Sequence, residues 1–162
     1  MKAVRLIAAS LFCVAGSQAV AEDAAVQARA ITCLTGMEQG ETSWPDCRRL
    51  LFQPCAGFVV GAEGHLTCLA EQKAGWQNRL DATTRTLNDR LTAEGSGQLT
   101  DLLGQWFGYV GNKCNGVAQE KADISADAAR LGCEISEFAG LSIEFDSCLQ
   151  GKSLSPYCIL QE

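Results

Sequence analysis

Cysteine is the residue type whose chemistry is clearest in this sequence. Nine cysteines occur among 162 residues, and eight of them lie beyond an N-terminal segment that has the features of a signal peptide. An even number of cysteines in an exported chain is typical of a disulfide framework. We therefore expect disulfide bonds among Cys33, Cys47, Cys55, Cys68, Cys114, Cys133, Cys148 and Cys158.

The sequence is compatible with more than one pairing of these cysteines. Eight cysteines allow on the order of a hundred pairings. Bonds between sequence neighbours are the most economical choice, and this neighbour scheme consists of Cys33–Cys47, Cys55–Cys68, Cys114–Cys133 and Cys148–Cys158. The main rival is Cys68–Cys114, because an antiparallel helix pair would bring these two residues to the same end.

The cysteines do not indicate a metal or redox site. No two of them have C-x-x-C spacing, and His65 is the single histidine that could add a ligand. A zinc site would need ligands from distant parts of the chain, and a thioredoxin-like oxidoreductase needs the missing motif. We expect neither a metal nor a cofactor.

Catalytic constellations are only weakly indicated. A hydrolase triad could be drawn from His65, a carboxylate and one of several serines, although nothing in the sequence places them together. The serines considered are Ser43, Ser96 and Ser125. Paired acids of a glycosidase could be Glu63 with Glu71, or Asp101 with Asp123. Carboxylates scattered over exposed helical faces explain these acids better, so we expect a protein without enzymatic activity.

Acidic residues gather around the start of the last predicted helix. We name this set the acidic rim, and it consists of Glu120, Asp123, Asp127, Glu134 and Glu137. A negative rim could steer a basic partner into contact. The alternative is a solvated face whose carboxylates complement the helix dipole.

Three aromatic residues could form a carbohydrate-stacking platform, namely Trp76, Trp106 and Tyr109. At helical spacing, large aromatic side chains are more often part of the core of a small helical domain. We therefore predict that all three are packing residues.

The first residues predict export. Lys2 and Arg5 precede a short apolar run, and a small-x-small cleavage site ends at Ala21, so residues 1–21 read as a signal peptide. The run is too short to span a bilayer.

Removal of residues 1–21 leaves 11 basic and 19 acidic residues, a formal net charge of −8. This charge disfavours nucleic acid and favours basic partners. We expect a periplasmic or secreted chain without a transmembrane segment.

The longest helical pattern runs from Cys68 to Leu91, with apolar residues three or four positions apart on one face. A turn is predicted at residues 94–97, and a second helix follows that ends near residues 114–116. Two helices with a short connection lie antiparallel. No long stretch alternates as strands do, so we predict an all-α fold, a small disulfide-stapled bundle with a central antiparallel helix hairpin.

Shorter helices are expected on both sides of this hairpin. One covers residues 24–35, and a second starts at Ser43, with a proline in its first turn. Residues 57–64 read as a connection and residues 115–123 as a polar loop, after which Ser125 caps the last helix. We divide the mature chain into an N-terminal helical extension, residues 22–62, and a helical domain, residues 63–162.

From about residue 55 to residue 149 the chain resembles the lysozyme-inhibitor LprI-like family of exported helical domains. The residues that carry the resemblance are Cys55, Cys68, Glu71, Trp76, Leu80, Trp106, Tyr109, Cys114 and Cys133. The chain departs from the family at Val110, where an arginine is usual, and at Phe138 and Leu141, in place of a threonine and an arginine. It also lacks the family's Gly-Gly-Ser run.

The resemblance implies a protein that binds and inhibits lysozyme-type muramidases, which are typically cationic, and the acidic rim is the surface we expect it to use. The alternative is a disulfide-stapled helical module of the cell envelope that binds another protein without inhibiting lysozyme.

Overall fold

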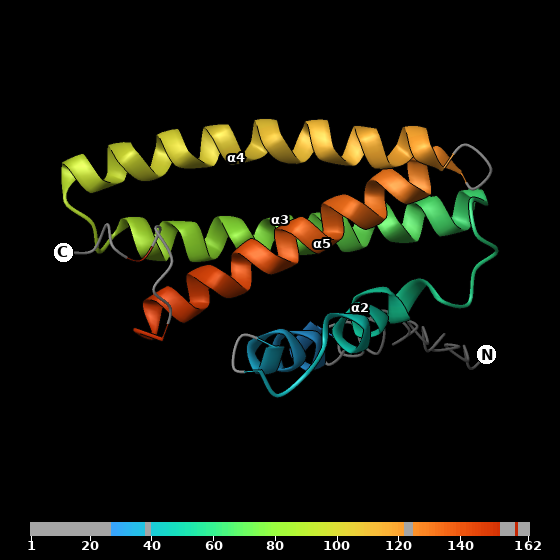
Figure 1. The fold of residues 1–162 in the computed structure, drawn as a ribbon, viewed down its shortest axis with the longest axis horizontal. Coiled ribbons are helices and arrows are strands. Elements are labelled where there is room, and N and C mark those ends of the chain that lie inside the picture. The colour runs from blue at the N-terminus through green and yellow to red at the C-terminus, as the bar shows by residue number, and fades with distance from the viewer. Residues whose placement is uncertain (1–26, 38–39, 122–124, 153–157, 159–162) are drawn as a thin grey trace, which may run out of the picture.

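The computed structural model of the chain describes residues 27–37, 40–121, 125–152 and 158, and the predicted signal peptide lies outside these ranges. Residues 27–37 are helical. The elements that follow are α2 (Trp44–Phe52), the short 3₁₀ helix η1 (Gln53–Cys55), α3 (Glu63–Asn88), α4 (Ala93–Glu120) and α5 (Ala126–Leu149) (Figure 1). The described residues contain no strand, so the prediction of an all-α fold is confirmed.

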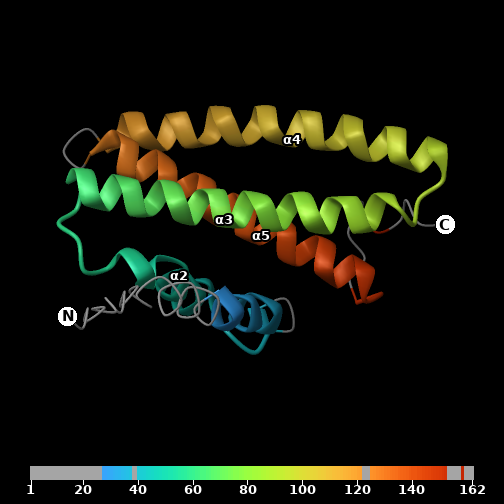
Figure 2. The ribbon, with the colours of Figure 1, turned by 180° about the vertical axis from the view of Figure 1, so that it is seen from behind.

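The predicted antiparallel pair is α3 and α4, and α5 packs against both of them. α3 and α4 make few contacts with each other, and each makes most of its contacts with α5. In Figure 1 α5 crosses in front of α3, and in Figure 2 α3 lies in front of α5. A helix buried on several sides is apolar over much of its surface. The buried residues of α5 are Ala128, Leu131, Ile135, Phe138, Ala139, Leu141, Ser142, Ile143, Phe145, Ser147 and Cys148.

The turn between α3 and α4 lies earlier than predicted. It covers residues 89–92, and the predicted turn, residues 94–97, belongs to the first turns of α4. Thr92 is the N-cap of α4, and its Oγ1 accepts a hydrogen bond from the Gly95 N–H at 3.2 Å. Because this cap satisfies an otherwise unpaired donor, the helix starts before the glycines instead of after them.

The end of α4 also differs from the prediction. The helix runs to Glu120, so the expected polar loop at residues 115–123 is helical over most of its length. Gly116 inside the helix costs about 1 kcal/mol relative to alanine. The disulfide between Cys114 and Cys133 holds this part of α4 against α5. Packing and the cross-link therefore override the local preference of the glycine.

The helix starts predicted at Ser43 and Ser125 are confirmed, and Ser43 is the N-cap of α2, with proline in the first turn. The connection predicted at residues 57–64 covers residues 56–62 instead, because α3 starts at Glu63 and not at Cys68. The Ser125 Oγ accepts a hydrogen bond from the Ala128 N–H at 3.3 Å and caps α5. Gly151, with a φ of +66°, follows the end of α5, a backbone conformation that glycine adopts without a steric penalty.

Four disulfide bonds confirm the neighbour scheme, so the rival bond Cys68–Cys114 is wrong. They are Cys33–Cys47, Cys55–Cys68, Cys114–Cys133 and Cys148–Cys158. Their Cα–Cα distances run from 4.9 to 5.8 Å, within the usual range. The bond between α4 and α5 closes a loop with a sequence separation of 19, which contributes about 3 kcal/mol in the chain-entropy model.

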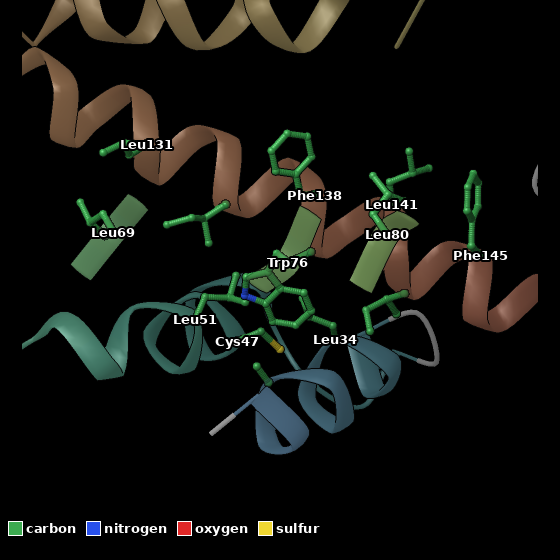
Figure 3. Close-up of a cluster of buried hydrophobic side chains, with 14 of the residues drawn as sticks. Leu34, Cys47, Leu51, Leu69, Trp76, Leu80, Leu131, Phe138, Leu141 and Phe145 are labelled. Atoms are coloured by element: carbon green, nitrogen blue, oxygen red, sulfur yellow. The ribbon is translucent and has the colours of Figure 1, made fainter. Parts of the chain in front are cut away.

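The core lies where α3, α5 and the N-terminal helices meet (Figure 3). Trp76 of α3 is only 2% exposed. Its indole lies beside Leu34, Cys47 and Leu51 of the N-terminal helices. One cluster of buried residues thus includes side chains from the predicted extension and from the predicted helical domain.

Candidate functional site

A prominent apolar surface lies on the connection between η1 and α3. Phe58, Val59 and Val60 are consecutive residues with 47%, 78% and 63% of their surface exposed. We name residues 56–62 the apolar loop. It stands at the end of the bundle where α3 and α5 begin (Figure 1). Scattered apolar residues on a surface need no explanation, but a contiguous exposed group is typical of an interaction site.

Several contacts hold the apolar loop in place. The disulfide between Cys55 and Cys68 closes it, with a Cα–Cα distance of 5.8 Å. The Gly61 N–H donates a hydrogen bond to the His65 Nδ1 at 3.2 Å. Gly61 has a φ of +80°, and a Cβ at this residue would lie 2.7 Å from the Ser125 Cβ. The loop is therefore ordered before it meets a partner, which lowers the entropic cost of binding.

Two carboxylates of the predicted acidic rim form ion pairs with neighbouring helices. The Glu134 Oε2 lies 2.7 Å from the Lys73 Nζ of α3, and its Oε1 lies 3.2 Å from the Arg130 Nη1. The Glu137 Oε1 lies 2.8 Å from the Lys113 Nζ of α4. These two glutamates join α5 to its neighbours, and their charge is largely balanced.

Of the other rim residues, Asp127 also has a basic partner. The Asp127 Oδ1 lies 3.3 Å from the Arg130 Nη2. Glu120 is exposed at the end of α4, next to Lys121. Asp123 lies outside the described residues. The sequence did not indicate that Lys73 of α3 and Lys113 of α4 pair with these glutamates.

The ion pairs raise the pKa of two basic groups. The hydrogen bond with Glu137 raises the pKa of Lys113 above its usual 10.5, although partial burial opposes the shift. The hydrogen bond with Asp127 likewise raises the pKa of Arg130. The raised pKa values reflect the stabilisation of each positive charge by its carboxylate partner.

The three predicted packing aromatics have different environments. Trp76 lies in the core, as predicted. Trp106 is half-buried, with its ring centroid 5.7 Å from that of Phe138. Tyr109 is 56% exposed, so its prediction as a packing residue is wrong. Because α4 packs almost entirely on α5, the rest of its surface, which includes Tyr109, is left to solvent. The Lys113 Nζ, which pairs with Glu137 of α5, lies 5.6 Å from the centroid of the Tyr109 ring.

The three departures from the LprI-like pattern occupy buried positions. Val110, Phe138 and Leu141 are 3%, 5% and 4% exposed. An arginine at any of these positions would need a partner for its buried charge. In this chain the departures therefore change the core rather than a binding surface.

The candidate catalytic groups do not come together. The Nδ1 of His65 is occupied by the loop backbone. Ser96 donates to the Asn88 Oδ1 at 2.6 Å, Ser43 donates to Asp46, and Ser125 caps α5. Glu63 and Glu71 are both exposed on α3, and eight residues of helix separate them by about 12 Å, too far for a glycosidase pair. Asp101 is exposed on α4.

The described residues contain no group of three His, Cys, Asp or Glu side chains that could hold a metal ion. None of the helices among them is long and apolar enough to cross a membrane.

Comparison of the chain with known proteins found no matching family model, no similar curated protein and no similar solved structure. The resemblance to the LprI-like family stays a prediction.

Proposed function

We propose that this chain is an exported, non-enzymatic binding protein that inserts the apolar loop into a concave site of a protein partner. The observation that carries the proposal is the exposure of Phe58, Val59 and Val60 on a loop closed by a disulfide bond. Apolar anchors that fill a pocket supply much of the binding free energy of an interface. A loop that is ordered beforehand loses little entropy on binding.

Export is supported by the predicted signal peptide and by the covalent structure. Four disulfide bonds persist in an oxidising compartment and are rare in a reducing cytosol. We place the mature protein in the periplasm or outside the cell.

We propose lysozyme-type muramidases as the first partner to test. The resemblance to the LprI-like family supports this choice. Lysozymes have a concave substrate cleft that could receive the apolar loop. A formal net charge of −8 on the mature chain would attract a cationic enzyme at a distance, at a rate that falls with salt.

The ion pairs of the acidic rim favour a second candidate function. Glu134 and Glu137 are engaged by Lys73 and Lys113, which leaves less unbalanced negative charge for a cationic partner. In this second candidate the chain is an envelope module that uses the same apolar loop on another protein and does not inhibit lysozyme.

A lysozyme turbidity assay with purified, oxidised residues 22–162 separates the two candidates. We expect inhibition at low salt, and we expect Val59→Asp to weaken it at least tenfold, a loss of about 1.4 kcal/mol. The matched control is Ala82→Asp, which places the same charge at an exposed position of α3 and should inhibit like the wild type. No inhibition by the wild type at any salt concentration favours the second candidate. Equal inhibition by Val59→Asp removes the loop from the interface.

A further inference from the structure

A groove of about 450 Å³ lies between α2 and α4, over the N-terminal half of α5. Small residues of α5, Ala129 and Gly132, form part of its floor. Phe52 of α2 and Val117 of α4 line it from either side. The volume is within the range of small-molecule sites, which are mostly apolar with a few polar groups.

Basic side chains border this groove from two sides. Arg48 comes from α2, and Lys113 and Lys121 come from α4 and its C-cap. One carboxylate also lines the groove, that of Glu137, and it is bound to Lys113 at 2.8 Å. Within the described part of the chain, neither Arg48 nor Lys121 forms an ion pair with a carboxylate. Among the described residues, Arg48 and Lys121 thus bring positive charge to the groove without a paired carboxylate.

This local charge is opposite to that of the whole chain, whose formal net charge is −6. An acidic protein that keeps unpaired cations beside an apolar groove offers a complementary surface to a ligand with an apolar body and a negative end. We propose that the groove binds a small amphipathic anion of the fatty-acid class. The aliphatic chain would lie on the floor of α5, and the carboxylate would meet Arg48 and Lys121.

Gly132 keeps the groove open. A Cβ at this position would lie 3.6 Å from the ring of Phe52, an ordinary van der Waals contact, so a larger side chain can be added without a backbone clash. The longer side chain of leucine would extend into the groove. Gly132→Leu therefore tests occupancy of the groove while it favours the helical backbone of α5.

The test is calorimetric titration of the oxidised mature protein with dodecanoate below its micelle concentration. We expect saturable binding by the wild type, and a loss of affinity of about tenfold in Arg48→Glu and in Lys121→Glu, the equivalent of about 1.4 kcal/mol. Lys152→Glu is the matched control, since this exposed lysine follows the far end of α5. Dodecyltrimethylammonium, with the same chain and the opposite charge, should not bind.

Gly132→Leu should abolish dodecanoate binding while circular dichroism shows a native helix content. Ala129→Leu, on the same floor, serves as a second filling variant. The proposal is overturned by non-saturable heats, by equal affinity for dodecyltrimethylammonium, or by unchanged binding in a folded filling variant. Val60 of the apolar loop lines one edge of the groove, but its neighbour Val59 does not. Val59→Asp should therefore leave dodecanoate binding unchanged. Loss of lysozyme binding and loss of dodecanoate binding can thus be told apart in the same variant.

Discussion

Gly61 of the apolar loop lies directly against Ser125, the N-cap residue of α5. A Cβ added to Gly61 would come within 2.7 Å of the Ser125 Cβ, and the φ of Gly61 is +80°. The residues that start α3 and α5 are far apart in the sequence, yet this contact makes the shape of the loop depend on both helices. A change at Gly61 should therefore disturb the loop and the cap together.

Gly61→Ala should destabilise the protein by about 2 kcal/mol. A side chain at positive φ costs about 1 kcal/mol or more, and the contact with Ser125 adds to it. Urea-induced unfolding measures the loss. Gly57→Ala is the matched control in the same loop, because a Cβ there meets nothing within 4 Å, and its stability should stay close to that of the wild type. Equal stability of the two variants would contradict the described contact.

Trp76→Ala should cost about 3–5 kcal/mol, because it leaves a cavity between α3 and the N-terminal helices. Tyr109→Ala should change stability by no more than about 0.5 kcal/mol, since the side chain is mostly in water. Thermal unfolding of the two variants gives the comparison. A large loss of stability in Tyr109→Ala would support the packing role that was predicted from the sequence.

Removal of the disulfide between α4 and α5, by Cys114→Ser with Cys133→Ser, should lower stability by about 3 kcal/mol. Denaturant unfolding of the double variant measures this effect. Peptide mapping of the wild type without reduction should yield only the four neighbour pairs. A linked Cys68–Cys114 peptide would refute the described connectivity.

The ion pair between Lys113 and Glu137 predicts a pH-dependent contribution to stability. Folding raises the pKa of Lys113 above 10.5, so the stabilisation is fully present below the unfolded-state pKa and is lost as the pH rises through the folded-state pKa. Glu137→Gln should cost about 0.5 kcal/mol near neutral pH, a value usual for a partly exposed pair.

Urea unfolding of Glu137→Gln and of the wild type, near neutral pH and well above pH 10.5, measures the contribution of this ion pair to stability. The difference should fade at the higher pH. Asp46→Asn, which breaks the exposed pair with Arg49, is the control and should have little effect at either pH. A Glu137→Gln difference that does not change with pH would exclude Lys113 as its source.

Local features of this fold could be predicted from the sequence. Ser43 and Ser125 act on the helix starts beside them, and the disulfide bonds join cysteines that are neighbours in the chain. The length of α4 and the burial of α5 on several sides could not be predicted in this way. Both depend on contacts between helices, and Gly116 locally favours a helix end that the tertiary structure does not use.

The surroundings of the acidic rim, of Tyr109 and of the apolar loop were harder to predict, because they too depend on contacts between helices. The rim glutamates were recognised as a cluster, but Lys73 and Lys113 reach them from other helices. Tyr109 has helical spacing that fits a core residue, and only the one-sided packing of α4 exposes it. The run Phe58-Val59-Val60 was visible between glycines, but its exposure depends on where the surrounding helices leave it uncovered.

The apolar loop is the proposed contact with a protein partner. The most direct measurement is the equilibrium affinity of the oxidised mature protein for lysozyme, by calorimetry at low salt, for the wild type, Val59→Asp and the control Ala82→Asp. We predict saturable binding by the wild type and the control, and an affinity at least about tenfold lower for Val59→Asp. Absence of binding by the wild type would contradict the choice of lysozyme as partner, and undiminished binding by Val59→Asp would contradict the role of the loop.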